Sequence, residues 1–450
     1  MPALSRRTFV KTSSGAALAA FASQAPRNGQ PAKIFTVFFD IAPSRDDSNL
    51  QPLTNEEIVR RLQQDCPGVE FVVRDLTRGA KLPALLNEAR DLRKLGYDGV
   101  VIYGWPRDYD LLRTGLPTIN IAVLNDFMNI PYPLFRQNRV VGAMLDPWRF
   151  SADPKVSERM FQDLIDQIKL IRALRRMKRE RILTVTDSAY VNVMYGDVLK
   201  NPPPRYNETI LAAIAGTFGT QVTRISSKEV IEDPDIPKLW NEDNAEANQI
   251  AQRWIRGAQK MTYTIPSEVV KSAKLYLAMR MLMRKYDATA VAFHIRSLIK
   301  DPRPEDFVYP ALGVSEAQLH NLVIKCQSHL NIVLSEMLLQ YAYGRPSMLG
   351  DYSVDTYHNT SCVQHCAGPW NPWGDERRVP YILTDHRERR VRARNQPGVG
   401  AGLWVLYPPN EPVTMWQIDV LSKEILFHSG PTVHMLTGPV HYRDHLWEMM

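Results

Sequence analysis

The hydrophobic pattern divides most of the chain into strands that alternate with helices. Short apolar runs such as Lys33–Ile41 and Gly99–Tyr103 predict buried strands. Asn55–Gln64, which lies between them, carries apolar residues at helical spacing. Because strands that alternate with helices are typical of a parallel sheet covered on both faces, residues 31–150 are predicted to form a Rossmann-like domain.

The same alternation restarts after Pro154 and stops in the last quarter of the chain. Apolar runs at Ile182–Thr186 and Ala288–Phe293, with helices between them, predict a second Rossmann-like domain over residues 151–370. From Val379 onward helical periodicity is lost, and short strands alternate with turns. The expected fold is therefore α/β, with two doubly wound domains followed by an antiparallel β-barrel over residues 371–450.

The first thirty residues have the pattern of an export signal. Arg6 and Arg7 precede an uncharged, mildly apolar stretch, Gly15–Ala22. This stretch is much shorter than the ~20 residues that a membrane-spanning helix needs. We expect residues 1–30 to be a twin-arginine signal peptide and linker, without a membrane span, that sends the protein to the periplasm or another extracytoplasmic space. The alternative is a disordered basic N-terminus.

Charge and cysteine content exclude some classes of function. The formal net charge is +7, and Arg6, Arg7 and Lys11, which precede the apolar stretch of the predicted signal, supply three positive charges. The remainder is too small for a chain of 450 residues to indicate a nucleic-acid partner. Four cysteines in so long a chain do not indicate a disulfide scaffold.

Histidines are confined to the last third of the chain. The first 293 residues contain none, and the ten are His294, His320, His329, His358, His365, His386, His428, His434, His441 and His445. Histidine is the commonest metal ligand and a general base near neutral pH. This distribution favours a reactive site in the C-terminal half, although some of these residues are expected on surface loops.

Asp351 and His365 are the strongest candidates for such a site. Asp351 is expected at the end of a short strand, and His365 near the end of the next strand. A carboxylate and an imidazole on neighbouring strand ends can share a divalent ion. The alternative is that Asp351 caps a turn and His365 is a core residue.

Several segments carry a family resemblance over roughly residues 285–425. They are Tyr309–Ser315, Lys325–His329, Gly344–Asp351, Val354-Asp355, Asn359-Thr360, His365-Cys366 and Pro412-Val413-Thr414. Together they resemble the C-terminal half of the L-fucose/L-arabinose isomerase superfamily, especially its L-fucose isomerase-like members. The resemblance implies Rossmann-like N-terminal domains, a C-terminal β-barrel and homo-oligomers, either trimers or hexamers.

The resemblance also implies a chemistry and a set of residues. Members bind Mn²⁺ or a similar divalent ion, which holds two oxygens of an open-chain sugar during aldose–ketose isomerisation through an enediol. Carried over, Asp351 is a metal ligand and proton carrier, and His365 is a histidine near the metal. His386 matches a histidine that contacts the substrate or the metal.

One departure from the family motif affects this chemistry directly. The family sequence Cys-Glu-Gly-Asp is replaced by Cys326-Gln327-Ser328-His329. The Gln327 amide can bind a metal weakly, but it cannot accept a proton at neutral pH. His329 replaces the lost ligand or base if it shares a strand face with Gln327. Alternatively, His329 opens the next helix and the family reaction is lost.

Two further features fit a sugar pocket. Trp370 and Trp373 lie in a Pro/Gly-rich loop and offer flat faces to a sugar ring, or they form a hydrophobic plug at a subunit interface. Arg390 and Arg392 belong to a row of arginines that suggests an acidic ligand, or a solvated basic strand.

The leading hypothesis is a metal-dependent sugar isomerase that acts outside the cytoplasm on a neutral or acidic monosaccharide. A second hypothesis is a carbohydrate-binding protein that kept the isomerase fold and lost the chemistry, and Gln327 motivates it. A third is a metal-dependent epimerase or lyase, since these reactions share the enediol step.

Overall fold

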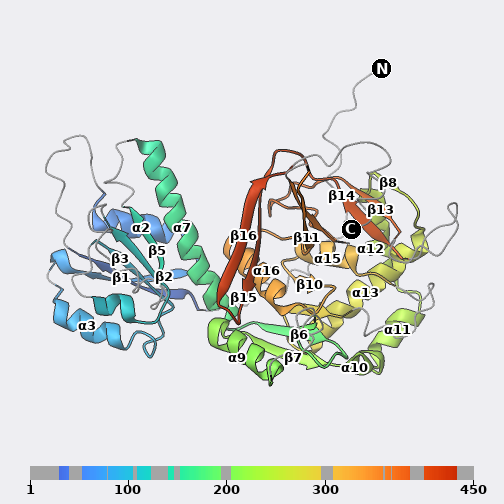
Figure 1. The fold of residues 1–450 in the computed structure, drawn as a ribbon, viewed down its shortest axis with the longest axis horizontal. Coiled ribbons are helices and arrows are strands. Elements are labelled where there is room, and N and C mark those ends of the chain that lie inside the picture. The colour runs from blue at the N-terminus through green and yellow to red at the C-terminus, as the bar shows by residue number, and fades with distance from the viewer. Residues whose placement is uncertain are drawn as a thin grey trace, which may run out of the picture. The chain divides into compact units, whose positions relative to one another are not determined.

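The computed structural model describes eleven stretches of the chain. By its internal contacts the chain divides into two compact units, Met1–Met160 and Phe161–Met450 (Figure 1). The described residues are 30–39, 53–78, 80–104, 109–122, 140–145, 153–193, 204–294, 308–357, 360–365, 367–385 and 400–432. The predicted boundary at residue 150 lies near the division between the units. Apart from residues 151–160, the predicted second and third domains both lie in the second unit. The predicted signal peptide lies outside the described residues.

The first unit is built on a five-stranded parallel sheet. Its strand order is β2-β1-β3-β4-β5. The strands are β1 (Ala32–Phe38), β2 (Val69–Asp75), β3 (Gly99–Tyr103), β4 (Thr118–Ala122) and β5 (Val140–Leu145). The helices are α2 (Asn55–Asp65), η1 (Leu76–Arg78), α3 (Leu82–Arg90) and η2 (Tyr109–Arg113). This order is that of a doubly wound α/β fold, as predicted.

Local sequence signals explain the helix between the first two strands. Thr54 and Glu57 form a capping box at the start of α2, in which each side chain accepts from the other residue's backbone N–H. Ile58 and Leu62, four residues apart, are the buried positions of this helix. The apolar spacing in the sequence therefore identifies the face that α2 buries.

The second unit contains a four-stranded parallel sheet of order β10-β9-β6-β7. Its strands are β6 (Arg181–Val185), β7 (Gln221–Ile225), β9 (Ala290–Phe293) and β10 (Val323–Lys325). Its helices are α7 (Pro154–Met177, which begins in the first unit), α9 (Tyr206–Phe218), α10 (Ser227–Ile231), α11 (Asp235–Asn241), α12 (Ala245–Gly257), α13 (Pro266–Lys285), α15 (Ala311–Leu319) and α16 (Leu330–Tyr343).

Alternate residues of this sheet enter two different hydrophobic cores. Leu183 and Val291 pack in the core formed with α12, α13 and α15. Ile182 and Ala290, their strand neighbours, pack in the core formed with α7, α9 and α16. Because successive strand side chains point to opposite faces, helices cover both sides of the sheet. The prediction of a second doubly wound sheet is confirmed.

Antiparallel pairing appears in the last hundred residues. The strands are β11 (Asp351–Asp355), β12 (Thr360–Gln364), β13 (Tyr381–Thr384), β14 (Gly402–Val405), β15 (Pro412–Asp419) and β16 (Glu424–Pro431), with β8 (Lys260–Met261) joining β13 in parallel. They form a β11-β12 hairpin, a β14-β13-β8 sheet and a β15-β16 hairpin. Within the described ranges these pieces do not close into one barrel.

β15 lies against α16, where the hydroxyl of Ser335 accepts the backbone N–H of Ile418 at 3.0 Å. This contact attaches the last hairpin to the helix that follows β10. Of the helices in the described ranges, none is both long enough and apolar enough to cross a bilayer.

Candidate functional site

The carboxyl edge of the second parallel sheet has a topological switch point between β6 and β9. From β6 the chain moves outward to β7 on one side, and then returns to add β9 on the other. Ligands of open α/β sheets bind at such points, outside the carboxyl ends of the strands. His294 directly follows β9 here, and its backbone N–H donates to the carbonyl of Val185 at 2.8 Å.

The segment Cys326–His329 follows β10 at the same edge. Ser328 is fully buried, and its Oγ lies 3.4 and 3.5 Å from the carbonyl oxygens of Val185 and Ala292, to either of which its one O–H can donate. The Ser328 carbonyl accepts the backbone N–H of Val193 at 2.8 Å. Residues from the ends of β6 and β9 and from the chain that follows β6 therefore contact this segment.

Gln327 and His329 do not lie on one strand face, contrary to the expectation; instead His329 opens the next helix, which was the alternative. β10 ends at Lys325, so Gln327 and His329 do not share a strand face. His329 is the N-cap residue of α16, and the interpretation that it opens the next helix is confirmed. The strand stops early because Ser328 turns inward to bond to the ends of β6 and β9.

His329 is an uncharged imidazole at neutral pH. Burial lowers its pKa to about 4, against smaller raising effects of its own backbone and of Asp419. Its side chain makes no capping hydrogen bond to α16, and within the described ranges its buried Nδ1 has no partner. A neutral, unsatisfied ring nitrogen is suited to accept a hydrogen bond from a ligand or to bind a metal.

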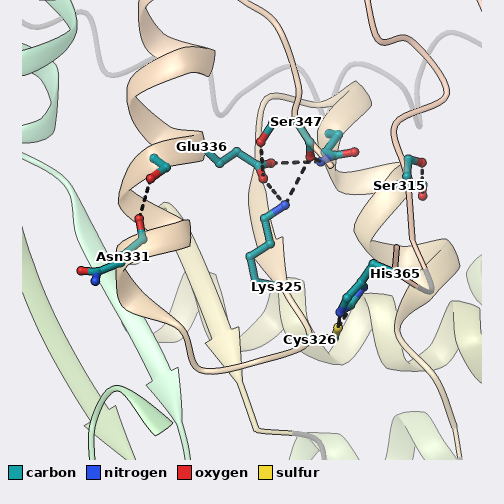
Figure 2. Close-up of polar contacts among 10 residues, drawn as sticks. Ser315, Lys325, Cys326, Asn331, Glu336, Ser347 and His365 are labelled. Atoms are coloured by element: carbon teal, nitrogen blue, oxygen red, sulfur yellow. Dashed lines mark hydrogen bonds and ion pairs between the residues drawn. The ribbon is translucent and has the colours of Figure 1, made fainter. Parts of the chain in front are cut away.

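His365, which directly follows β12, lies at the same edge next to Cys326. The Cys326 sulfur is 3.5 Å from Nε2 and 3.8 Å from Nδ1 of the His365 ring, and both residues are buried (Figure 2). Since the sulfur is nearly equidistant from both nitrogens, it is not aligned with one nitrogen lone pair. This contact therefore lacks the geometry of a nucleophilic Cys–His pair and acts as a packing contact.

Asp351 is placed next to His365 by strand pairing. Its backbone pairs with Gln364 across the β11-β12 hairpin, and His365 is the residue after Gln364. The expectation that Asp351 ends a strand is wrong, because it begins β11. The antiparallel pairing nevertheless brings the two residues to one end of the hairpin. The description of Asp351 covers its backbone only.

The two tryptophans of the Pro/Gly-rich loop have different surroundings. Trp370 is buried in the core and stacks on Tyr381 with 4.8 Å between ring centroids. Trp373 is half-buried and donates from Nε1 to Glu411 at 3.3 Å, while the Arg377 guanidinium lies 4.5 Å from its ring centroid. Trp370 is therefore a core residue, while Trp373 keeps a partly accessible ring, and the plug at a subunit interface stays a prediction.

The donors near this edge only partly fit a divalent ion. His329 has the charge state and the unsatisfied nitrogen that a ligand needs, and Gln327 supplies an amide oxygen. In the parts of the chain that the structure describes, however, no group of three His, Cys, Asp or Glu side chains is arranged to hold a metal. His386, Arg390 and Arg392 lie outside the described residues.

Two features of this edge were not predicted as parts of a site. His294 at the switch point is one, and its position directly after an apolar strand was the available signal. The other is a buried ion pair between Lys325 and Glu336. The available signal was a charged residue in an apolar segment. Lys325 ends the apolar run that begins at Val323, and Glu336 lies within the apolar helix Leu330–Tyr343.

The chain was compared with known proteins. Neither a scan against protein-family models nor a search of curated proteins gave a match.

Proposed function

We propose that this protein is a metal-dependent sugar isomerase-like enzyme whose site lies at the carboxyl edge of the β10-β9-β6-β7 sheet. One observation carries the proposal: Cys326 and His365, 39 positions apart, meet at this edge, and strand pairing puts Asp351 beside His365. These are the segments that resemble the L-fucose isomerase-like family. In this proposal the C-terminal strands correspond to the family's barrel.

The described residues suggest roles in handling a sugar. The Gln327 amide can donate to one hydroxyl and accept from another. The neutral His329 ring can accept a hydrogen bond from a sugar hydroxyl, while burial, which lowers its pKa to about 4, makes it a weak base. A bound divalent ion would stabilise negative charge that develops on adjacent sugar oxygens. Mn²⁺ is the ion proposed, and a neutral or acidic monosaccharide is the substrate class.

A carbohydrate-binding protein without isomerase activity is the second candidate. It is favoured by Gln327 and by the environment of Glu336, which lies in the helix that follows His329. That carboxylate is engaged by Lys325 and by the side chains of Gln318 and Ser347, so it is not available as a base. An epimerase or lyase that shares the enediol step remains the third candidate.

Other features of the proposal concern the protein's setting. We propose export by the twin-arginine pathway to the periplasm or another extracytoplasmic space, since Arg6 and Arg7 precede a short apolar stretch. We also propose a trimer or hexamer, as the family resemblance implies.

Metal content and turnover of the purified protein test the proposal together. The protein is loaded with Mn²⁺, its metal content is measured by mass spectrometry, and conversion of L-fucose, L-arabinose and D-glucuronate is followed by NMR. We expect aldose–ketose conversion that a chelator abolishes. His365→Ala should lose this conversion, whereas His428→Ala, a change at an exposed residue, should keep it. Sugar binding without conversion, unaffected by chelator, would establish the second candidate. Absence of both binding and conversion would contradict both.

A further inference from the structure

Lys325 and Glu336 form an ion pair that is completely enclosed by protein. Their side chains are 1% and 0% exposed. Lys325 is the last residue of β10, and Glu336 lies in the middle of α16, with its carboxylate toward the lysine (Figure 2). The pair therefore joins the end of the strand directly to the helix that follows it.

Two further residues complete the hydrogen bonding around the carboxylate. Glu336 Oε1 accepts from Gln318 Nε2 at 3.0 Å, and Oε2 accepts from Ser347 Oγ at 3.1 Å. The Ser347 carbonyl accepts from Gln318 Nε2 at 2.6 Å and from Lys325 Nζ at 3.4 Å. The network thus connects β10 and α16 with the last turn of α15 and the segment that leads to Asp351.

The position of this network relates it to the candidate site. The segment Cys326–His329 begins next to Lys325 and ends where α16 starts, so the ion pair closes the loop that contains it. Ser347 lies four residues before Asp351, the first residue of β11. The network holds both chain segments from which the candidate site residues come.

Stability alone is a poor explanation for a buried pair of this kind. Removing two charges from water is costly, and apolar side chains of similar volume often stabilise a fold equally well or better. What an ion pair adds is directional bonding, because a buried carboxylate bonded to Lys325, Gln318 and Ser347 is satisfied only when all three side chains are in place.

We propose that Lys325 and Glu336 are positioning residues that fix the Cys326–His329 segment and the approach to Asp351 in the geometry that the site needs. The role assigned to the site rests on the proposed function. The positioning itself can be measured without any sugar, since it predicts how tightly Cys326 is held against His365.

The test replaces the pair as a unit. Lys325→Met/Glu336→Leu removes both charges and keeps the volume, and Lys325→Gln/Glu336→Gln keeps polar groups of similar size. The control is Lys285→Met/Asp233→Leu, which removes a partly exposed pair with 2.6 Å between its charged atoms. Each variant is assayed for thermal stability, for the rate at which iodoacetamide alkylates Cys326 (read by peptide mass spectrometry) and for kcat and KM with L-fucose.

We expect Lys325→Met/Glu336→Leu to melt within a few degrees of the wild type while Cys326 is alkylated at least tenfold faster. With L-fucose, kcat should fall at least tenfold with a smaller change in KM, and the Gln/Gln variant should lie between this variant and the wild type. A folded Met/Leu variant with alkylation and kcat within twofold of the wild type would overturn the proposal. Failure of both double variants to fold would also overturn it, because it would assign the pair to folding alone.

The two proposals can fail separately. If the wild type neither binds nor converts any sugar, the proposed function fails, and the alkylation rate of Cys326 still decides whether the pair positions the segment. If sugar conversion is present and the alkylation rate is unchanged in the Met/Leu variant, only the positioning role fails.

Discussion

The Cys326 sulfur lies 3.5 Å from Nε2 of His365, and this contact joins the end of β10 to the end of β12 (Figure 2). The first residue directly follows a strand of the parallel sheet, and the second directly follows a strand of an antiparallel hairpin. Because both side chains are buried, the contact fixes two distant segments at the carboxyl edge of the sheet.

Gln327→Glu restores the carboxylate that the family motif has at this position. A carboxylate can transfer a proton and bind a divalent ion more strongly than an amide can. We expect kcat/KM for aldose–ketose conversion to rise at least tenfold and Mn²⁺ to bind more tightly. Turnover by NMR and calorimetric titration of Mn²⁺ check this, with Gln327→Ala as the control. If Gln327→Glu has no more activity than Gln327→Ala, the family chemistry does not operate at this position.

The half-buried His329 should make the protein less stable in acid. Its pKa is about 4 in the folded chain, below the value of about 6.5 expected when unfolded. Between these values the unfolded chain binds a proton that the folded chain does not, so stability falls as pH decreases from about 6.5 to about 4. The expected loss is about 1–3 kcal/mol, because the residue is only partly buried.

Denaturant unfolding of the wild type and of His329→Asn, measured between pH 7 and pH 4, checks this loss. The difference in unfolding free energy between the two proteins should shrink as the pH falls. The unfolding free energy of His428→Asn should change with pH as that of the wild type does. A constant difference over this range would show that His329 is not held neutral by burial.

Replacing one partner of the Lys325–Glu336 pair should lower the unfolding free energy more than replacing both partners. Lys325→Met leaves the fully buried carboxylate without its counter-charge, and we expect a loss of about 3–5 kcal/mol in unfolding free energy. Lys325→Met/Glu336→Leu should recover most of that loss. Chemical denaturation of the two variants measures the difference. Equal losses in both would indicate that the lysine stabilises the fold through packing rather than charge.

Gly374 allows the Pro/Gly-rich loop that carries Trp370 and Trp373 to approach the end of α16. Its φ is +77°, and a Cβ at this position would overlap the carbonyl oxygen of Gly344, the C-cap residue of α16. Gly96 has a similar φ of +78° but open space around it. We expect Gly96→Ala to cost about 1–2 kcal/mol and Gly374→Ala clearly more, as measured by thermal unfolding. Equal costs would mean that the loop shifts freely away from Gly344.

The alternation of strands and helices could be predicted from the sequence because it follows local periodicity. The strand Gly99–Tyr103 is as predicted, and the helix predicted at Asn55–Gln64 is one residue longer in the structure. The end of β10 was not predictable from periodicity. Ser328 bonds to β6 and β9, which are distant in sequence, and this tertiary contact ends the strand before Gln327.

The candidate site was predictable only in part for the same reason. The nearness of Asp351 and His365 was expected from their positions beside neighbouring strands, and the antiparallel pairing brings it about. The Lys325–Glu336 pair was missed because the two residues are neighbours only through the packing of α16 on the sheet. Trp370 was proposed as a sugar contact from its loop composition, which does not reveal its stacking on Tyr381.

The central claim is that Gln327 and His365 belong to one sugar site, and a double-mutant cycle on sugar affinity tests it most directly. Calorimetry would measure binding of the tightest sugar in the panel to the wild type, Gln327→Ala, His365→Ala and the double variant. We predict that each single variant weakens binding and that their effects are coupled by about 0.5–3 kcal/mol. Wild-type affinity in both single variants, or losses that add within about 0.5 kcal/mol, would contradict a shared site.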